Sequence, residues 1–162
     1  MRFAYPANIA RDEGGRFLVT FRDLPEAATD GADYAEALDE AVDCLTSALA
    51  FRLKYDEAAA LPSAQLPGEV LVAPDVLIGL KILLKRQIEE RNLSIAAVSR
   101  EIETDAKEVR RMLDPNHATK VRRLVEALQR LDMPINVVIE TRGEEEPPLP
   151  FDRDDSRRLA VA

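Results

Sequence analysis

The sequence has little cysteine and little histidine, with one residue of each among 162. A single cysteine excludes an internal disulfide framework and fits a reducing cytoplasm. Cys44 falls beside small apolar residues in a helical pattern, so we expect it to be a small buried hydrophobic residue. One Cys and one His also fall short of the ligand sets that hold structural zinc, and we expect no metal site.

Long apolar runs and nucleotide-binding motifs are also missing. No run approaches the 18 apolar residues of a membrane span, and the first fifteen residues lack the hydrophobic region of a signal peptide. The sequence contains neither a P-loop nor a GxGxxG motif. We therefore expect a cytoplasmic protein without a cofactor.

Charge is abundant but unevenly distributed. The chain carries 30 Asp and Glu against 22 Lys and Arg, a net charge of −8, which argues against nonspecific coating of nucleic acid. Residues 1–75 carry 6 basic against 14 acidic residues, and residues 124–162 carry 5 against 9. Residues 76–123 carry 11 basic against 7 acidic residues. A local basic block on an acidic protein indicates a surface that contacts phosphates.

The basic block contains a pattern typical of a helix-turn-helix at residues 94–114. Ser94 is suited to cap a short helix whose apolar residues fall at spacings of three and four. Glu103 and Thr104 make a turn, and Asp105 caps a second helix with Glu108 at capping-box spacing. An ordinary helical hairpin of a bundle is the alternative interpretation of the same pattern.

The second helix of this pattern is the candidate recognition helix, because such a helix enters the major groove of DNA. Glu103 stands where many such turns have glycine, and because a non-glycine residue in a left-handed conformation costs energy, we expect a distorted turn. Asp105 and Glu108 add negative charge that repels phosphates. The candidate DNA-binding residues are Thr104, Asp105, Lys107, Arg110 and Arg111.

Residues 1–75 predict a small α+β unit. Apolar residues alternate over 3–9 and 17–21 around a turn at 12–15, which predicts a β-hairpin. Asp33 and Glu36 form a capping box before a long helix, and residues 69–72 predict a further strand. This order predicts an antiparallel sheet with one helix across a face.

Carboxylates in the same region raise the possibility of a metal-dependent nuclease, which would hold Mg²⁺ with several of them. Most of them fall in predicted turns, which favour acidic residues without catalysis. No His or Lys of this region supplies an obvious partner for proton transfer, so we expect no catalytic residues. The carboxylates are Asp12, Glu13, Asp23, Glu26 and Asp30.

The remaining segments complete a second unit. A helix over 76–91 precedes the helix-turn-helix, and Thr119 is expected to cap a helix that follows it. Residues 135–139 alternate like a strand, which needs a partner and would find one in a second copy across a two-fold axis. The dimerisation residues would be Ile135, Val137 and Ile139. We expect domains at 1–75 and 76–140, with an acidic, proline-containing, disordered tail at 141–162.

Motifs of a known family occur in both predicted domains. The first set is Tyr5-Pro6, Gly15 to Phe21, Asp23 to Ala27, Gly31, Glu36 to Leu38, Ala41, Pro62-Ser63 and Gly68-Glu69. The second set is Arg111 to Lys120, Leu124 and Ala127-Leu128. On these residues the chain resembles HicB-type antitoxins, the DNA-binding half of HicA/HicB toxin–antitoxin pairs, over residues 1–140. Two separate domains match in the family's order.

The resemblance implies a partial ribonuclease-H-like N-terminal domain that binds a HicA-type toxin without catalysis. It also implies a C-terminal helix-turn-helix that binds operator DNA as a dimer. Two other interpretations stay open from the residues alone. One is a stand-alone transcription regulator whose N-terminal domain senses a ligand, and the other is a carboxylate-dependent hydrolase.

Overall fold

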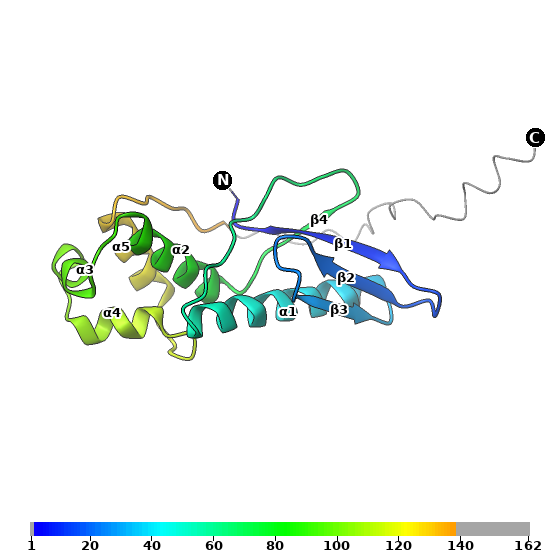
Figure 1. The fold of residues 1–162 in the computed structure, drawn as a ribbon, viewed down its shortest axis with the longest axis horizontal. Helices are drawn as coiled ribbons and strands as arrows, with labels where there is room; N and C mark the ends of the chain where they lie inside the picture. The colour runs from blue at the N-terminus through cyan, green and yellow to red at the C-terminus, as the bar shows by residue number, and fades with distance from the viewer. Residues whose placement is uncertain (1, 139–162) are drawn as a thin grey trace, which may run out of the picture.

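The computed structural model describes residues 2–138, so the predicted tail at 141–162 lies outside the described residues. The described part is α+β, as predicted, with a four-stranded sheet at one end and a group of helices at the other (Figure 1). In chain order the elements are β1 (Tyr5–Arg11), β2 (Phe17–Phe21), β3 (Ala28–Gly31), α1 (Tyr34–Lys54), β4 (Val70–Val72), α2 (Val76–Glu90), α3 (Ile95–Glu101), α4 (Ala106–Leu113) and α5 (Val121–Arg130).

The sheet is antiparallel throughout, with the strand order β3-β2-β1-β4. The predicted hairpin is confirmed, and its alternating apolar residues face α1. Strand β3 was not predicted because its four residues, Ala-Thr-Asp-Gly, carry no apolar alternation. Cys44 of α1 lies beside this strand, with Sγ 3.5 Å from the carbonyl of Ala28. It is half-buried rather than buried as expected, and this partial burial raises the pKa of its thiol.

Helix α1 begins at the predicted capping box. The Glu36 N–H donates to Asp33 Oδ1 at 2.9 Å, and Glu36 Oε2 accepts from the Ala32 N–H at 2.5 Å. Gly31, the last residue of β3, lies against the first turn of α1. A Cβ added to Gly31 would come within 2.3 Å of the Ala37 nitrogen. Only glycine therefore allows β3 to run this closely into α1.

The segment between α1 and β4 has no regular structure but is fixed by side chains of the sheet. The Tyr5 hydroxyl donates to the carbonyl of Ala60 at 2.8 Å, and burial raises the pKa of Tyr5 to about 12. Asp23 accepts from both the N–H and the hydroxyl of Ser63, at 2.9 and 2.7 Å. Arg22 pairs with Glu69 at 2.7 Å. These contacts hold the loop against the core of the N-terminal unit.

Helix α2 joins two hydrophobic cores. Ile78 and Ile82 pack into the core formed by the sheet and α1. Leu80, Leu84 and Ile88 pack into the core formed by the later helices. The N-terminal unit therefore extends its packing past residue 75, and α2 lies between the two ends of the molecule (Figure 1).

Helices α3, α4 and α5 pack around the second half of α2. Their buried apolar residues follow the predicted spacings. The expected cap of the last helix is wrong: α5 begins after Lys120, which makes no side-chain capping bond. Thr119 is instead buried, and its Oγ1 lies 3.2 Å from Nδ1 of His117.

The predicted dimerisation strand has no regular secondary structure in the single chain over residues 133–138. Ile135 packs partly against the second core, whereas the side chains of Val137 and Val138 are exposed. Ile139 lies outside the described residues. A strand that pairs only with another copy would have no hydrogen-bonding partner in one chain.

Candidate nucleic-acid interface

Helices α3 and α4 form the predicted pair with both predicted caps. Ser94 Oγ accepts from the Ala97 N–H at 3.1 Å, and Asp105 Oδ1 accepts from the Glu108 N–H at 2.7 Å. Each cap satisfies one of the backbone donors that a helix leaves free at its N-terminus. The carboxylate of Asp105 is therefore engaged with its own helix.

The turn between the helices is closed by two backbone hydrogen bonds. The Thr104 N–H donates to the Ser99 carbonyl at 2.9 Å, and the Glu103 N–H donates to the Arg100 carbonyl at 3.3 Å. This is a Schellman motif, which requires a left-handed residue after the helix. Glu103 takes that conformation with φ of 53°, at the energetic cost that a residue other than glycine carries there.

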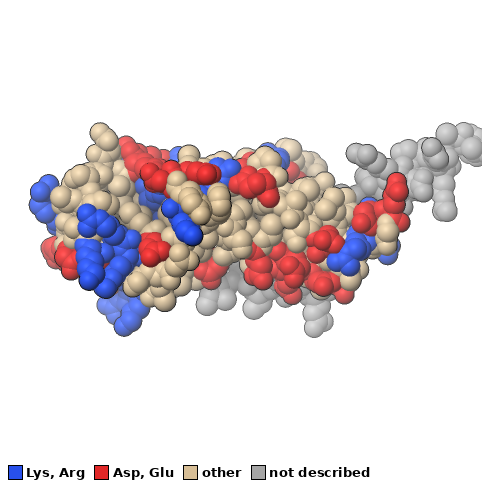
Figure 2. Space-filling model, turned by 60° about the horizontal axis from the view of Figure 1, so that its bottom comes forward, with Lys and Arg blue, Asp and Glu red and all other residues tan. Residues whose placement is uncertain are grey.

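The two sides of α4 differ in burial and charge. Val109 and Met112 are completely buried against the second core. Lys107, Arg110 and Arg111 are exposed on the opposite side. Figure 2 shows Lys and Arg gathered at this end of the molecule. The structure thus presents the predicted basic residues of α4 together on a surface.

These cations are weakly engaged within the chain. Arg110 Nη1 donates to the carbonyl of Ala106 at 3.4 Å, and Arg111 lies 3.6 Å from Glu108. Lys107 makes no ion pair with any residue in the part of the chain that the structure describes. A phosphate can therefore approach them without first displacing a strong partner.

The acidic residues of the motif are directed into structural contacts. Glu103 pairs with Arg130 of α5 at 2.9 Å. Asp105 caps α4, and Glu108 is half-buried beside Arg111. The repulsion expected from the sequence is reduced because each carboxylate faces a donor of the protein.

Lys81 of α2 is a residue that the sequence interpretation missed. Its side chain is fully buried, and its ammonium donates to the carbonyls of Asp114 and His117, at 2.6 Å to the latter. Burial lowers the pKa of Lys81, while the carboxylate of Asp114 acts in the opposite direction. The only signal in the sequence was one cation inside the otherwise apolar run 76–84. Lys81 fixes the loop that follows α4, and so fixes the position of α4.

Helix α5 adds basic residues that were also missed. Lys120 is exposed and Arg123 is half-buried at its first turn, and neither has an ion-pair partner among residues 2–138. Arg122 pairs with Glu126 at 2.8 Å, and this contact lowers the pKa of the Glu126 carboxyl. Lys120, Arg122 and Arg123 follow α4 in the sequence and lengthen the basic segment of the chain.

The carboxylates considered for a nuclease are separated in the structure. Asp23 holds Ser63, Glu26 pairs with Arg52 at 2.6 Å, and Asp30 pairs with Arg16. Within the described residues no group of three or more His, Cys, Asp and Glu side chains is placed to hold a metal ion. The structure gives no support to the nuclease interpretation.

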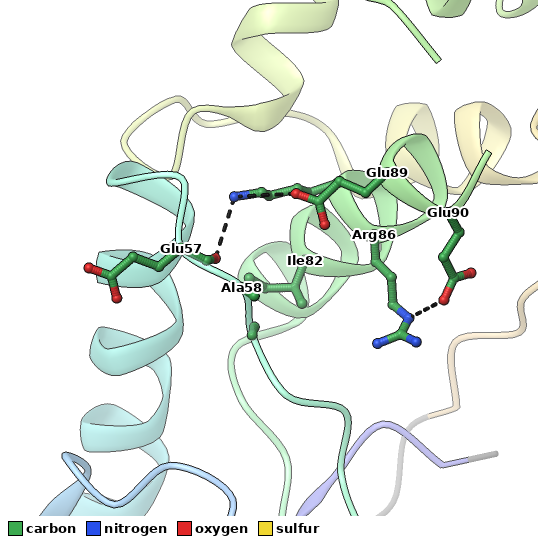
Figure 3. Close-up of a pocket in the computed structure, with 8 residues that line it drawn as sticks. Glu57, Ala58, Ile82, Arg86, Glu89 and Glu90 are labelled. Atoms are coloured by element: carbon green, nitrogen blue, oxygen red, sulfur yellow. Dashed lines mark hydrogen bonds and ion pairs between the residues drawn. The ribbon is translucent and has the colours of Figure 1, made fainter. Parts of the chain in front are cut away.

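A shallow pocket lies where residues 57–59 meet α2, and ion pairs close its polar side (Figure 3). Lys85 Nζ lies 2.8 Å from Asp56 and 3.7 Å from Glu89. Arg86 pairs with Glu90 at 2.6 Å. Lys85 and Arg86 are therefore already paired, which leaves these cations less available to orient a small ligand.

Comparison with known proteins matches both ends of the fold. Residues 4–83 match a family described as the HicB_like antitoxin of bacterial toxin–antitoxin systems. The chain is 31% identical to Antitoxin HicB 2 of Photorhabdus laumondii subsp. laumondii over 134 residues, which cover 83% of this chain and 94% of that protein. It is 27% identical to Antitoxin HicB of Escherichia coli K12 over 135 residues, covering 83% of this chain and 98% of the relative. No helix among the described residues is long and apolar enough to cross a membrane.

Replacing Glu103 tests the strain in the turn. Glu103→Gly removes a left-handed non-glycine residue, which costs roughly 1–2 kcal/mol. It also removes an exposed ion pair with Arg130, worth about 0–1 kcal/mol. We expect a net gain of about 0.5–1 kcal/mol in the free energy of unfolding, measured by urea denaturation. The control Glu103→Gln keeps the strain and loses the charge, so it should be no more stable than wild type. A Gly variant less stable than the Gln variant would contradict the strain argument.

Proposed function

Because this chain belongs to the HicB-like family of bacterial antitoxins, we propose that it neutralises a HicA-type ribonuclease toxin and represses its own operon. The family makes it the antitoxin of a toxin–antitoxin system. We assign toxin binding to the N-terminal unit and operator binding to the helix-turn-helix. Both activities would take place in the cytoplasm, where the messenger RNA targets of such a toxin are found.

One observation carries the proposal: the two ends of one molecule have opposite charge. Residues 1–75 have 14 acidic against 6 basic residues, whereas 76–123 have 11 basic against 7 acidic ones. A toxin that cleaves RNA must present a cationic surface, which an acidic domain can cover. DNA presents phosphates, which the exposed cations of α4 can contact.

The proposed mechanism of neutralisation is steric and electrostatic, without chemistry by the antitoxin. Three of the five carboxylates considered for a nuclease, Asp23, Glu26 and Asp30, are held by Ser63, Arg52 and Arg16 respectively. They stabilise the fold and are not gathered around a substrate site. The ligand-sensing alternative gains no support from the pocket at residues 57–59, because Lys85 and Arg86 beside it pair with Asp56, Glu89 and Glu90.

The DNA-binding proposal assigns different roles to neighbouring arginines of α4. Thr104 and Asp105 lie at the N-terminus of the recognition helix, with Lys107, Arg110 and Arg111 along its exposed side. An arginine that contacts guanine is worth roughly 1–3 kcal/mol of discrimination, whereas a phosphate contact weakens all sequences alike. We expect Arg110→Ala and Arg111→Ala to differ: one relaxes sequence preference, and the other mainly lowers affinity and flattens the salt dependence.

The measurement is a gel-shift titration of each variant on the DNA upstream of the gene, at two salt concentrations. Leu18→Ala is the control, because Leu18 is an exposed residue of β2, at the other end of the molecule from α4 (Figure 1). If wild-type protein, alone and with its toxin, prefers this DNA no more than random duplex, operator binding is excluded. Both arginine variants should still neutralise the toxin.

Dimerisation is proposed through residues 135–139, where Ile135, Val137 and Ile139 would line the buried side of a strand paired across a two-fold axis. Two α4 helices so related would read half-sites about 34 Å apart or a multiple of that. Val137→Pro removes a ladder hydrogen bond and should give monomers, or a much weaker dimer, by sedimentation. Asn136→Ala, a neighbouring change that keeps its backbone N–H, should leave the dimer intact. An unchanged dimer for the Val137→Pro variant would place the interface elsewhere.

A further inference from the structure

One side of α1 is exposed along its whole length and changes character from one end to the other. The side chains that share this side are acidic over the first two and a half turns and aromatic near the C-terminus. We call it the α1 stripe, and its members are Glu36, Asp39, Glu40, Asp43, Ser47, Phe51 and Tyr55. It spans about 28 Å at 1.5 Å per residue. Figure 2 shows Asp and Glu following this part of the molecule, away from the basic end.

Two carboxylates of the stripe, Glu40 and Asp43, are not paired with the described cations of their own domain. Arg16, Arg22 and Arg52 pair with Asp30, Glu69 and Glu26 respectively. Within residues 2–138, no ion pair involves Glu40 or Asp43.

The helix macrodipole does not account for these two carboxylates. That effect falls off within the first turn of a helix, and only Glu36 lies in the first turn of α1. The negative charges of Glu40 and Asp43 are therefore available to attract a cationic partner from solution.

The C-terminal end of the stripe exposes two large aromatic side chains. Phe51 is 55% exposed and Tyr55 is 56% exposed, and their ring centroids lie 4.5 Å apart. Lys54 Nζ lies 5.3 Å from the centroid of the Tyr55 ring. Exposed aromatic pairs beside charged residues are typical of the anchors of protein interfaces, which are enriched in aromatic residues and surrounded by polar rims.

We propose that the α1 stripe is the surface that binds the toxin, with the carboxylates facing its cationic RNA-binding side and Phe51 and Tyr55 as apolar anchors. This inference rests on the proposed antitoxin function, and it names the site of that function. The carboxylates act mainly on the rate of association, since charges steer an oppositely charged partner before contact. The aromatic pair acts mainly on the rate of dissociation, since burial of apolar area holds the complex together.

The other large exposed surface of the domain is the side of the sheet opposite α1. Asn8, Ala10, Leu18 and Thr20 pair across β1 and β2 on that side, and Asp30 of β3 lies beside Leu18 on the same side, where it pairs with Arg16. Because the Asp30 carboxylate already has a cationic partner, whereas Glu40 and Asp43 have none among the described residues, we assign the toxin to the stripe. The sheet surface supplies matched controls, because Leu18 is 45% exposed and comparable in exposure to Phe51.

The experiment measures the affinity and association rate of the purified full-length antitoxin for its toxin, at two salt concentrations. The toxin is separated from the wild-type complex in denaturant and refolded. The variants are Phe51→Ala, Tyr55→Ala and Glu40→Lys, and the controls are Leu18→Ala and Glu13→Lys, the latter at the tip of the β1–β2 hairpin. Circular dichroism and thermal unfolding confirm that each variant is folded.

We expect each stripe variant to lower affinity about tenfold or more, and each control to stay within about threefold of wild type. Glu40→Lys should slow association and flatten its salt dependence, whereas Phe51→Ala should speed dissociation. If wild-type protein binds the toxin and the stripe variants bind it equally well, the toxin does not bind at the stripe. A larger loss of affinity in Leu18→Ala than in the stripe variants leads to the same conclusion. Neither result contradicts the antitoxin function. Wild-type protein that does not bind the toxin overturns both.

Discussion

A buried ammonium group sets the arrangement of the basic end of this protein. Lys81 has no exposed surface, and its charge is satisfied by the backbone carbonyls of Asp114 and His117, more than thirty residues along the chain. An unpaired buried charge is far more costly than a hydrogen-bonded one, so the loop after α4 must stay where it meets α2. Because α2 also packs Ile78 and Ile82 into the sheet core, the position of α4 is tied to the N-terminal unit.

This connection explains how an acidic protein can carry the DNA-binding surface that we propose. The repulsion between DNA and the acidic unit falls off over about 8 Å at physiological ionic strength. The cations of α4 lie at the far end of the molecule from the sheet. The carboxylates nearest to α4 are used in a cap, in an ion pair with Arg130 and beside Arg111. The basic surface is thus separated from the acidic unit by distance, and the carboxylates near it are paired locally.

The helices of the site were predictable because their ends are set by local bonds. Ser94, Asp105 and Asp33 cap the helices that the sequence predicted, and the apolar spacings located the buried sides of α1, α2 and α4. The exposed basic side of α4 followed from the same spacings. The acidic and basic ends also followed from the order of charges along the chain.

What the sequence left out depends on contacts between distant residues. Strand β3 is four residues long and is defined by pairing with β2, not by its own pattern. The partners of Lys81 and the ion pair between Glu103 and Arg130 join segments far apart in the chain. Residues 135–138 have no regular structure in one chain, and the strand expected there depends on a second copy.

We propose that this protein silences a ribonuclease by covering its RNA-binding surface. The most direct measurement is the rate of RNA cleavage by the toxin at fixed concentration while full-length antitoxin is added. We expect the cleavage rate to fall linearly to zero, with an end point at a fixed molar ratio, and inhibition to weaken as the salt concentration rises. Undiminished cleavage in the presence of excess folded antitoxin would contradict it.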